Sequence, residues 1–66
     1  MTQVRDGHWL RASRRQLGLT LRQLADRLYM YGTHAPDHLR HMEKGRRAIP
    51  GAIRSAVEQM LQNGKV

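Results

Sequence analysis

The sequence of 66 residues contains no cysteine and no phenylalanine, and only five of its residues are acidic. The absence of cysteine excludes a disulfide framework and a thiolate metal site. No stretch approaches the ~20 consecutive apolar residues that a membrane-spanning helix requires. The first residues also lack the apolar run of a signal peptide. We therefore expect a cytoplasmic protein with no membrane contact.

The short length limits the hydrophobic core. A chain of about 60 residues buries only roughly 60% of the surface that its unfolded form exposes. The free energy of unfolding is therefore expected to be small unless a partner adds to it. The sequence shows no internal repeat, linker or change of composition that would divide it. We expect a single domain over residues 1–66.

Positive charge is the strongest compositional signal. The sequence has 12 Lys and Arg residues against 5 Asp and Glu, a formal net charge of +7 and an isoelectric point near 11.4. All of these cations except Lys44 and Lys65 are arginines, whose planar guanidinium can donate two parallel hydrogen bonds to a phosphate or a base edge. This composition favours contact with nucleic acid. An anionic membrane is a weaker alternative, because the basic segments carry no wide apolar face.

Residue spacing and N-terminal signals predict two helices in the first half of the chain. Asp6 is a suitable N-cap for a helix over residues 7–17, because its carboxylate can accept the early amide protons. Thr20 and Gln23 have the spacing of a capping box, which predicts the start of a second helix over residues 21–31.

Proline marks the start of two further helices. Pro36 fits the first position of a helix over residues 36–44, and Pro50 fits that of a helix over residues 50–62, because the first positions of a helix need no amide donor. Glycines suited to the turn that ends a helix follow each of the first three segments: Gly18, Gly32 and Gly45. No strand pattern is present. The fold class is therefore all-α: a compact domain of four helices, with a fifth left open.

Apolar residues at helical spacing predict the inward face of each helix. These residues are Leu10, Leu17, Leu21, Leu24, Ala25, Leu28, Tyr31, Leu39, Met42, Ile53, Ala56, Val57 and Met60. The third helix is too short to persist alone in water, so its two apolar residues must hold it against the other helices.

The segment from Leu17 to Pro50 resembles the helix-turn-helix domain of the lambdoid phage repressor and Cro family, also called the XRE family. The likeness depends on the order and spacing of several short motifs rather than on any one of them. The residues that carry it are Arg14, Leu17-Gly18-Leu19-Thr20, Leu24-Ala25, Leu28, Leu39, Met42-Glu43-Lys44-Gly45, Arg46-Arg47 and Pro50.

The resemblance implies one structural ion pair. In the family, an arginine and a glutamate at the positions of Arg14 and Glu43 pair across the domain, which here would tie the first helix to the end of the third. The sequence departs from the family in two places. Glu43 lies later than in the family, so the extra residues must lengthen the second helix or loosen the turn over residues 29–35. Leu21 also stands where the family commonly has a polar residue that contacts phosphate.

The resemblance also implies a DNA-reading face. The first residues of the third helix in this family reach base edges in the major groove. Arg40 is the strongest candidate, as a bidentate donor to guanine. The matching positions for base contacts are Pro36, Asp37, His38, Arg40 and His41. Contacts to DNA phosphates are expected from Thr20, Arg22, Lys44, Arg46 and Arg47, together with amides at helix N-termini.

Metal and enzyme chemistry find little support in the sequence. His34, His38 and His41 are candidate metal ligands, but Pro36 starts the helix after His34 and breaks their alignment on one face. We expect no metal, no other cofactor and no small-molecule ligand. Protonation of these histidines at mildly acidic pH should instead strengthen DNA binding. We also expect no enzymatic activity, because no serine has an evident base and orienting acid.

Several apolar or aromatic residues have no clear place in a four-helix core and are candidates for a dimer interface: Trp9, Tyr29, Tyr31 and Leu61. A homodimer would bind two half-sites about one DNA turn apart, which compensates for the small DNA surface that one domain covers.

These observations together predict a repressor that binds a pseudo-palindromic operator as a dimer, on the nucleoid, and regulates its own operon. Small phage and mobile-element autorepressors, including those encoded beside anti-CRISPR genes, are analogues in size only. One alternative is an antitoxin that neutralises a protein toxin and binds DNA secondarily. RNA binding is a third possibility, but the few aromatic residues do not suit base stacking.

Overall fold

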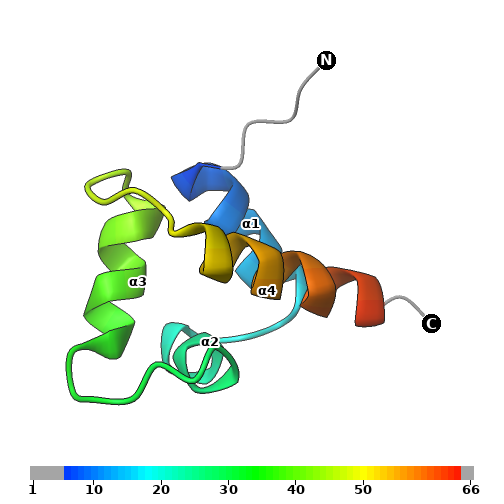
Figure 1. Ribbon diagram of the computed structural model, residues 1–66, viewed down its shortest axis with the longest axis horizontal. Helices are drawn as coiled ribbons and strands as arrows, with labels where there is room; N and C mark the ends of the chain where they lie inside the picture. Colours follow the sequence, from blue (N-terminus) through cyan, green and yellow to red (C-terminus); the bar gives the residue numbers. More distant parts are fainter. Residues whose placement is uncertain (1–5, 65–66) are drawn as a thin grey trace.

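The computed structural model describes residues 6–64, which form four helices and no strand within that range (Figure 1). Their bounds are Gly7–Gln16 for α1, Leu21–Arg27 for α2, Ala35–Glu43 for α3 and Gly51–Asn63 for α4. The predicted all-α class is confirmed. None of the helices in this range is long and apolar enough to cross a bilayer. Arg5 and Lys65, which contribute to the net charge, lie outside the described residues.

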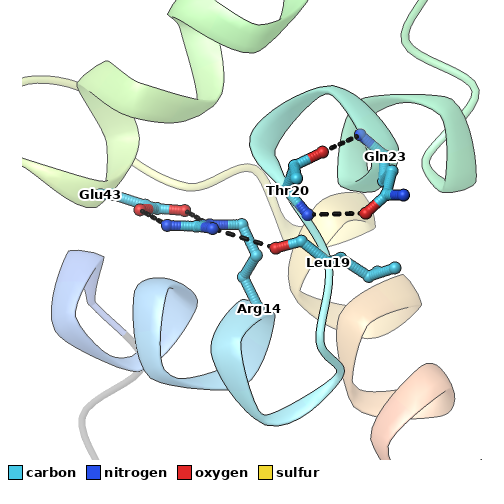
Figure 2. Close-up of polar contacts among 5 residues, drawn as sticks. All are labelled: Arg14, Leu19, Thr20, Gln23 and Glu43. Atoms are coloured by element: carbon cyan, nitrogen blue, oxygen red, sulfur yellow. Dashed lines mark hydrogen bonds and ion pairs between the residues drawn. The ribbon is translucent and has the colours of Figure 1, made fainter.

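The predicted N-terminal caps of α1 and α2 are both present. The Asp6 carboxylate accepts a hydrogen bond from the Trp9 amide at 3.1 Å. In the capping box of α2, the Gln23 amide donates to the Thr20 hydroxyl at 3.1 Å, and the Thr20 amide donates to the Gln23 side chain at 2.9 Å (Figure 2). Such bonds satisfy amides that have no partner within the helix. The starts of α1 and α2 therefore match the prediction.

The two prolines each stand one residue away from the predicted position. α3 begins at Ala35, so Pro36 is its second residue rather than its first. α4 begins at Gly51, and Pro50 is its N-cap. Neither place demands an intrahelical amide donor, because the first amides of a helix have no carbonyl partner.

α1, α2 and α3 all end in the same pair of backbone hydrogen bonds around a residue with positive φ, the arrangement known as the Schellman motif. At α1 and α3 this residue is glycine, Gly18 and Gly45, as predicted. At α2 it is Tyr29, with a φ of 58°. The amides of Tyr29 and Met30 donate to the carbonyls of Asp26 and Ala25, which closes the helix four residues earlier than predicted.

The prediction of a helix over residues 21–31 is therefore wrong at its C-terminal end. The helix is shorter than predicted, and the connection to α3 covers residues 28–34. Tyr31, which was expected on the inward face of this helix, is 76% exposed. Gly32 has a positive φ but lies within the connection, not at a helix end.

Each helix contributes one fully buried aliphatic side chain to the core: Leu10, Leu24, Leu39 and Val57. Ala25, Ala35 and Met42 complete the buried cluster. Burying one such aliphatic side chain contributes about 1.5–3 kcal/mol to the free energy of unfolding. Apart from Tyr31, the predicted inward residues are buried or half-buried.

α3 lies at one end of the molecule, where it packs mainly on α1 and α2, whereas α4 packs on α1 (Figure 1). The connections over residues 28–34 and 44–50 leave α3 at its two ends. Within residues 6–64, no other helix covers the side of α3 that faces away from α1 and α2.

Candidate nucleic-acid interface

The ion pair implied by the resemblance is present between Arg14 on α1 and Glu43 at the end of α3 (Figure 2). Arg14 Nε donates to Oε2 of Glu43 at 2.8 Å, and Nη2 donates to Oε1 at 3.2 Å. Nη1 of Arg14 donates to the Leu19 carbonyl at 3.0 Å. The two charged side chains are only 16% and 7% exposed. This bidentate pair therefore holds the C-terminal end of α3 against α1 and the segment before α2.

Gly7 makes a second contact between α1 and the end of α3, which the sequence analysis did not predict. Gly7 is buried, and a Cβ atom at this position would lie 2.5 Å from the Met42 carbonyl oxygen and 2.8 Å from the Glu43 carbonyl carbon. Only a residue without a side chain allows the backbones to approach so closely. A glycine in the first turn of a helix is the one signal in the sequence that could have indicated this contact.

The outer face of α3 carries polar side chains in the pattern i, i+3, i+4, i+7. With 3.6 residues per turn, these positions lie opposite the buried residues of the same helix. The four residues are Asp37, Arg40, His41 and Lys44, of which only His41 is half-buried. Three of the five predicted base-contact residues thus share one face. The other two, Pro36 and His38, are half-buried and lie on its two flanks.

A groove of about 200 Å³ runs along one flank of α3, between α1, the start of α2 and α3. Its lining residues are Arg11, Arg14, Leu21, Arg40, Glu43 and Lys44. Arg14 and Glu43 neutralise each other, so the net charge of the groove comes from the other three cations. Within residues 6–64, none of those three is paired with an acidic side chain. Arg11 was not among the predicted contact residues, because its proximity to α3 arises only in the folded chain.

A depression of about 300 Å³ lies on the opposite flank of α3. Its lining residues are His34, Asp37, His38, His41 and Arg47. Arg47 reaches it from the connection between α3 and α4. In the described part of the chain, no group of three or more His, Cys, Asp or Glu side chains is arranged to hold a metal ion. The flank therefore combines imidazoles, one carboxylate and one guanidinium.

The residues predicted to contact phosphate are all exposed and lie in two segments. Thr20 and Arg22 belong to the start of α2, and Arg22 lines a depression of about 700 Å³ together with Pro36. Lys44, Arg46 and Arg47 follow one another at the C-terminal end of α3. The Arg46 amide donates to the His41 carbonyl, which fixes the backbone of this second segment.

The four candidates for a dimer interface do not share one environment. Trp9 on α1 and Leu61 on α4 are half-buried and pack against the core, so both have a place in the fold that the sequence analysis did not foresee. Tyr29 and Tyr31 lie in the 28–34 connection and are 79% and 76% exposed. They are the exposed large hydrophobic residues of the described chain.

Comparisons with models of known protein families, with curated proteins and with solved structures found no significant match.

Proposed function

We propose that this protein is a sequence-specific DNA-binding repressor of the helix-turn-helix type, with α3 in the major groove of the DNA. The proposal rests mainly on one observation. α3 lies at an end of the molecule, presents Arg40 and Lys44 outward, and has further cations on both flanks, Arg11 on one and Arg47 on the other.

The dimensions of DNA agree with this arrangement. An α-helix with its side chains is about 10–12 Å across, and the major groove of B-DNA is about 12 Å wide. A helix in the groove therefore has a phosphate backbone near each of its flanks. Arg11 and Arg47 stand on those flanks, so each would face a different backbone. The net charge of +7 adds a favourable term that is independent of DNA sequence.

The side chains on the outer face of α3 have complementary roles in this proposal. Arg40 donates two hydrogen bonds to a guanine, and Asp37 accepts one from a cytosine amino group. His41 reaches either a base edge or a phosphate. Pro36 and His38 lie on the flanks of this face, too far to the side to contact bases at the centre of the groove. In this proposal Pro36 contacts a thymine methyl group, and His38 and Arg47 donate hydrogen bonds to a phosphate.

The connection between α2 and α3 differs from the usual helix-turn-helix motif, whose turn has about three or four residues. Here the connection covers residues 28–34. A longer turn restrains the position of the first residues of α3 less tightly than a turn of three or four residues would. The opposite end of α3 is held more firmly, by the Arg14–Glu43 pair and by the close approach at Gly7. We infer that this end sets the angle at which α3 enters the groove.

A single domain of this size covers about 600–1,000 Å² in a specific DNA complex. A homodimer on a pseudo-palindromic operator would double that area and read two half-sites. Occlusion of a promoter is the simplest regulatory outcome, and control of its own operon is the expected biological role.

The test is selection from a pool of random duplexes, followed by fluorescence anisotropy with the enriched duplex. We expect a consensus with two-fold symmetry and a binding free energy that Arg40→Ala weakens by about 1–3 kcal/mol. The Arg40→Ala variant should also tolerate base changes at one position of each half-site. Failure of the wild-type protein to enrich any sequence, or to bind any duplex at low ionic strength, would refute the proposal.

A further inference from the structure

The exposed face of α1 carries a row of basic residues, His8, Arg11 and Arg15. His8, Arg11, Ala12, Arg15 and Gln16 line a shallow depression there, and all five are exposed. Arg11 and Arg15 are one helical turn apart. Like charges at this spacing repel each other by about 0.2–0.5 kcal/mol, so the interaction between these two arginines does not stabilise α1. Arg15 lies in the last turn, where a cation favours the helix dipole, but Arg11 lies in the middle of the helix.

This row is continuous with the cationic flank of α3. Arg11 lines both the depression on α1 and the groove that contains Arg40 and Lys44. The only acidic side chain that lines either of these two hollows is Glu43, which Arg14 neutralises. A positively charged surface therefore extends from the outer face of α3 across Arg11 to Arg15.

We propose that Arg11 and Arg15 form a phosphate track, through which α1 binds the DNA backbone beyond the part of the major groove that α3 occupies. The inference rests on the proposed function and extends its contact surface along α1, from Arg11 to Arg15. The two residues are separated by about 6 Å along the helix axis. One nucleotide step of a DNA strand rises ~3.4 Å along the duplex axis. Both arginine side chains are long and exposed, so the pair can contact two nearby phosphates of the same strand.

The track contributes affinity and position but no base preference, because phosphates carry no sequence information directly. Its loss should weaken binding to the operator and to unrelated duplexes by the same factor. It should also shorten the stretch of backbone that the protein protects from hydroxyl radicals. The shortening should occur on one strand, on the side of each half-site that lies against α1.

The experiment compares two double variants with equal loss of charge. Arg11→Gln/Arg15→Gln removes the phosphate track, and Arg27→Gln/Arg54→Gln removes two exposed arginines on α2 and α4 that line neither hollow. Binding to the selected duplex and to an unrelated duplex is measured over a range of salt concentrations, and circular dichroism verifies that both variants fold. Hydroxyl-radical footprinting of both complexes gives the length of backbone that is protected.

The track variant should reduce the slope of log K against log salt by up to about 1.8 for each protomer, and so by up to about 3.6 for the dimer, because each lost phosphate contact removes about 0.9. Its ratio of operator to non-operator affinity should be unchanged, and the control should keep most of the wild-type slope. Equal slopes in the two variants with strong wild-type binding would overturn the phosphate track and leave the proposed function standing. Absence of wild-type DNA binding would overturn both proposals.

Discussion

Removing the charge of Glu43 tests how α3 is held in place. Glu43→Gln keeps the size of the side chain but removes its charge, so one of the two hydrogen bonds from Arg14, over 2.8 Å and 3.2 Å, loses its acceptor. Breaking a fully buried pair costs about 3–5 kcal/mol. Because Arg14 is 16% exposed and keeps its bond to the Leu19 carbonyl, we expect a smaller loss, about 2 kcal/mol.

This loss is large relative to the stability of the whole domain. At roughly 0.05–0.15 kcal/mol per residue, a chain of this length has a free energy of unfolding of about 3–10 kcal/mol. The assay is urea denaturation followed by circular dichroism. Asp26→Asn is the matched control, because Asp26 is exposed on α2 and loses the same charge. The control should stay within about 0.5 kcal/mol of the wild type.

A double-mutant cycle separates the pair from its surroundings. Replacing both partners, in Arg14→Met/Glu43→Leu, leaves no stranded charge, so the double variant should be more stable than the sum of the single variants predicts. The expected coupling energy is at least 1 kcal/mol. A Glu43→Gln variant as stable as the Asp26→Asn control, or a coupling energy near zero, would refute the idea that this ion pair anchors α3.

Three further predictions concern backbone geometry and phosphate contact. Gly7→Ala should lower the free energy of unfolding by about 2 kcal/mol or more, because its Cβ would overlap two carbonyl groups of α3. Gly51→Ala is the control: the structure has space for a Cβ there, so the free energy of unfolding should rise by about 0.5–1 kcal/mol. Equal effects of the two substitutions in denaturation would contradict the close contact at Gly7. Tyr29→Gly should stabilise the domain by about 1 kcal/mol, because glycine adopts a φ of 58° without the strain that a tyrosine has there. Tyr31→Gly is the control and should not stabilise the domain, because Tyr31 has no positive φ. A lower thermal midpoint for Tyr29→Gly than for the wild type would contradict this reasoning. Arg47→Ala should weaken binding to all duplexes and reduce the salt slope by about 0.9 for each protomer, which is about 1.8 for the dimer; an unchanged slope would remove Arg47 from the phosphate contacts.

The features that could be predicted from the sequence are those that depend on interactions between residues close together in the chain. The cap at Asp6 and the capping box of Thr20 and Gln23 join residues only three apart, so their spacing alone indicates the bonds. The glycines at the ends of α1 and α3 were predictable for the same reason, because few other residues adopt a positive φ without strain.

The end of α2 was not predictable, because Tyr29 adopts the positive φ that glycine usually adopts at the end of a helix. Sequence spacing favoured Gly32 as the stop, yet Tyr29 closes the helix and Met30 turns back toward the core. The hydrophobic contact made by Met30 offsets the local strain at Tyr29. Local preference was therefore overridden by packing, which a short-range pattern does not contain.

The candidate interface was predictable only in part. The resemblance indicated Arg14 and Glu43, which are 29 positions apart and could not have been paired by spacing. It also indicated the residues of α3. The positions of Gly7 and Arg11 beside α3 depend on how α1 crosses that helix, so they became visible only in the folded chain.

Titration of ¹⁵N-labelled protein with the selected duplex, followed by amide chemical shifts, tests the central claim most directly. If α3 occupies the major groove, the largest shifts will lie between Asp37 and Lys44 and at Arg47, with smaller ones at Thr20 and Arg22. Residues 55–63 of α4 will change little unless they form the dimer contact. Largest shifts outside α3 and its two flanks, or no shifts with any duplex at low ionic strength, would contradict the account.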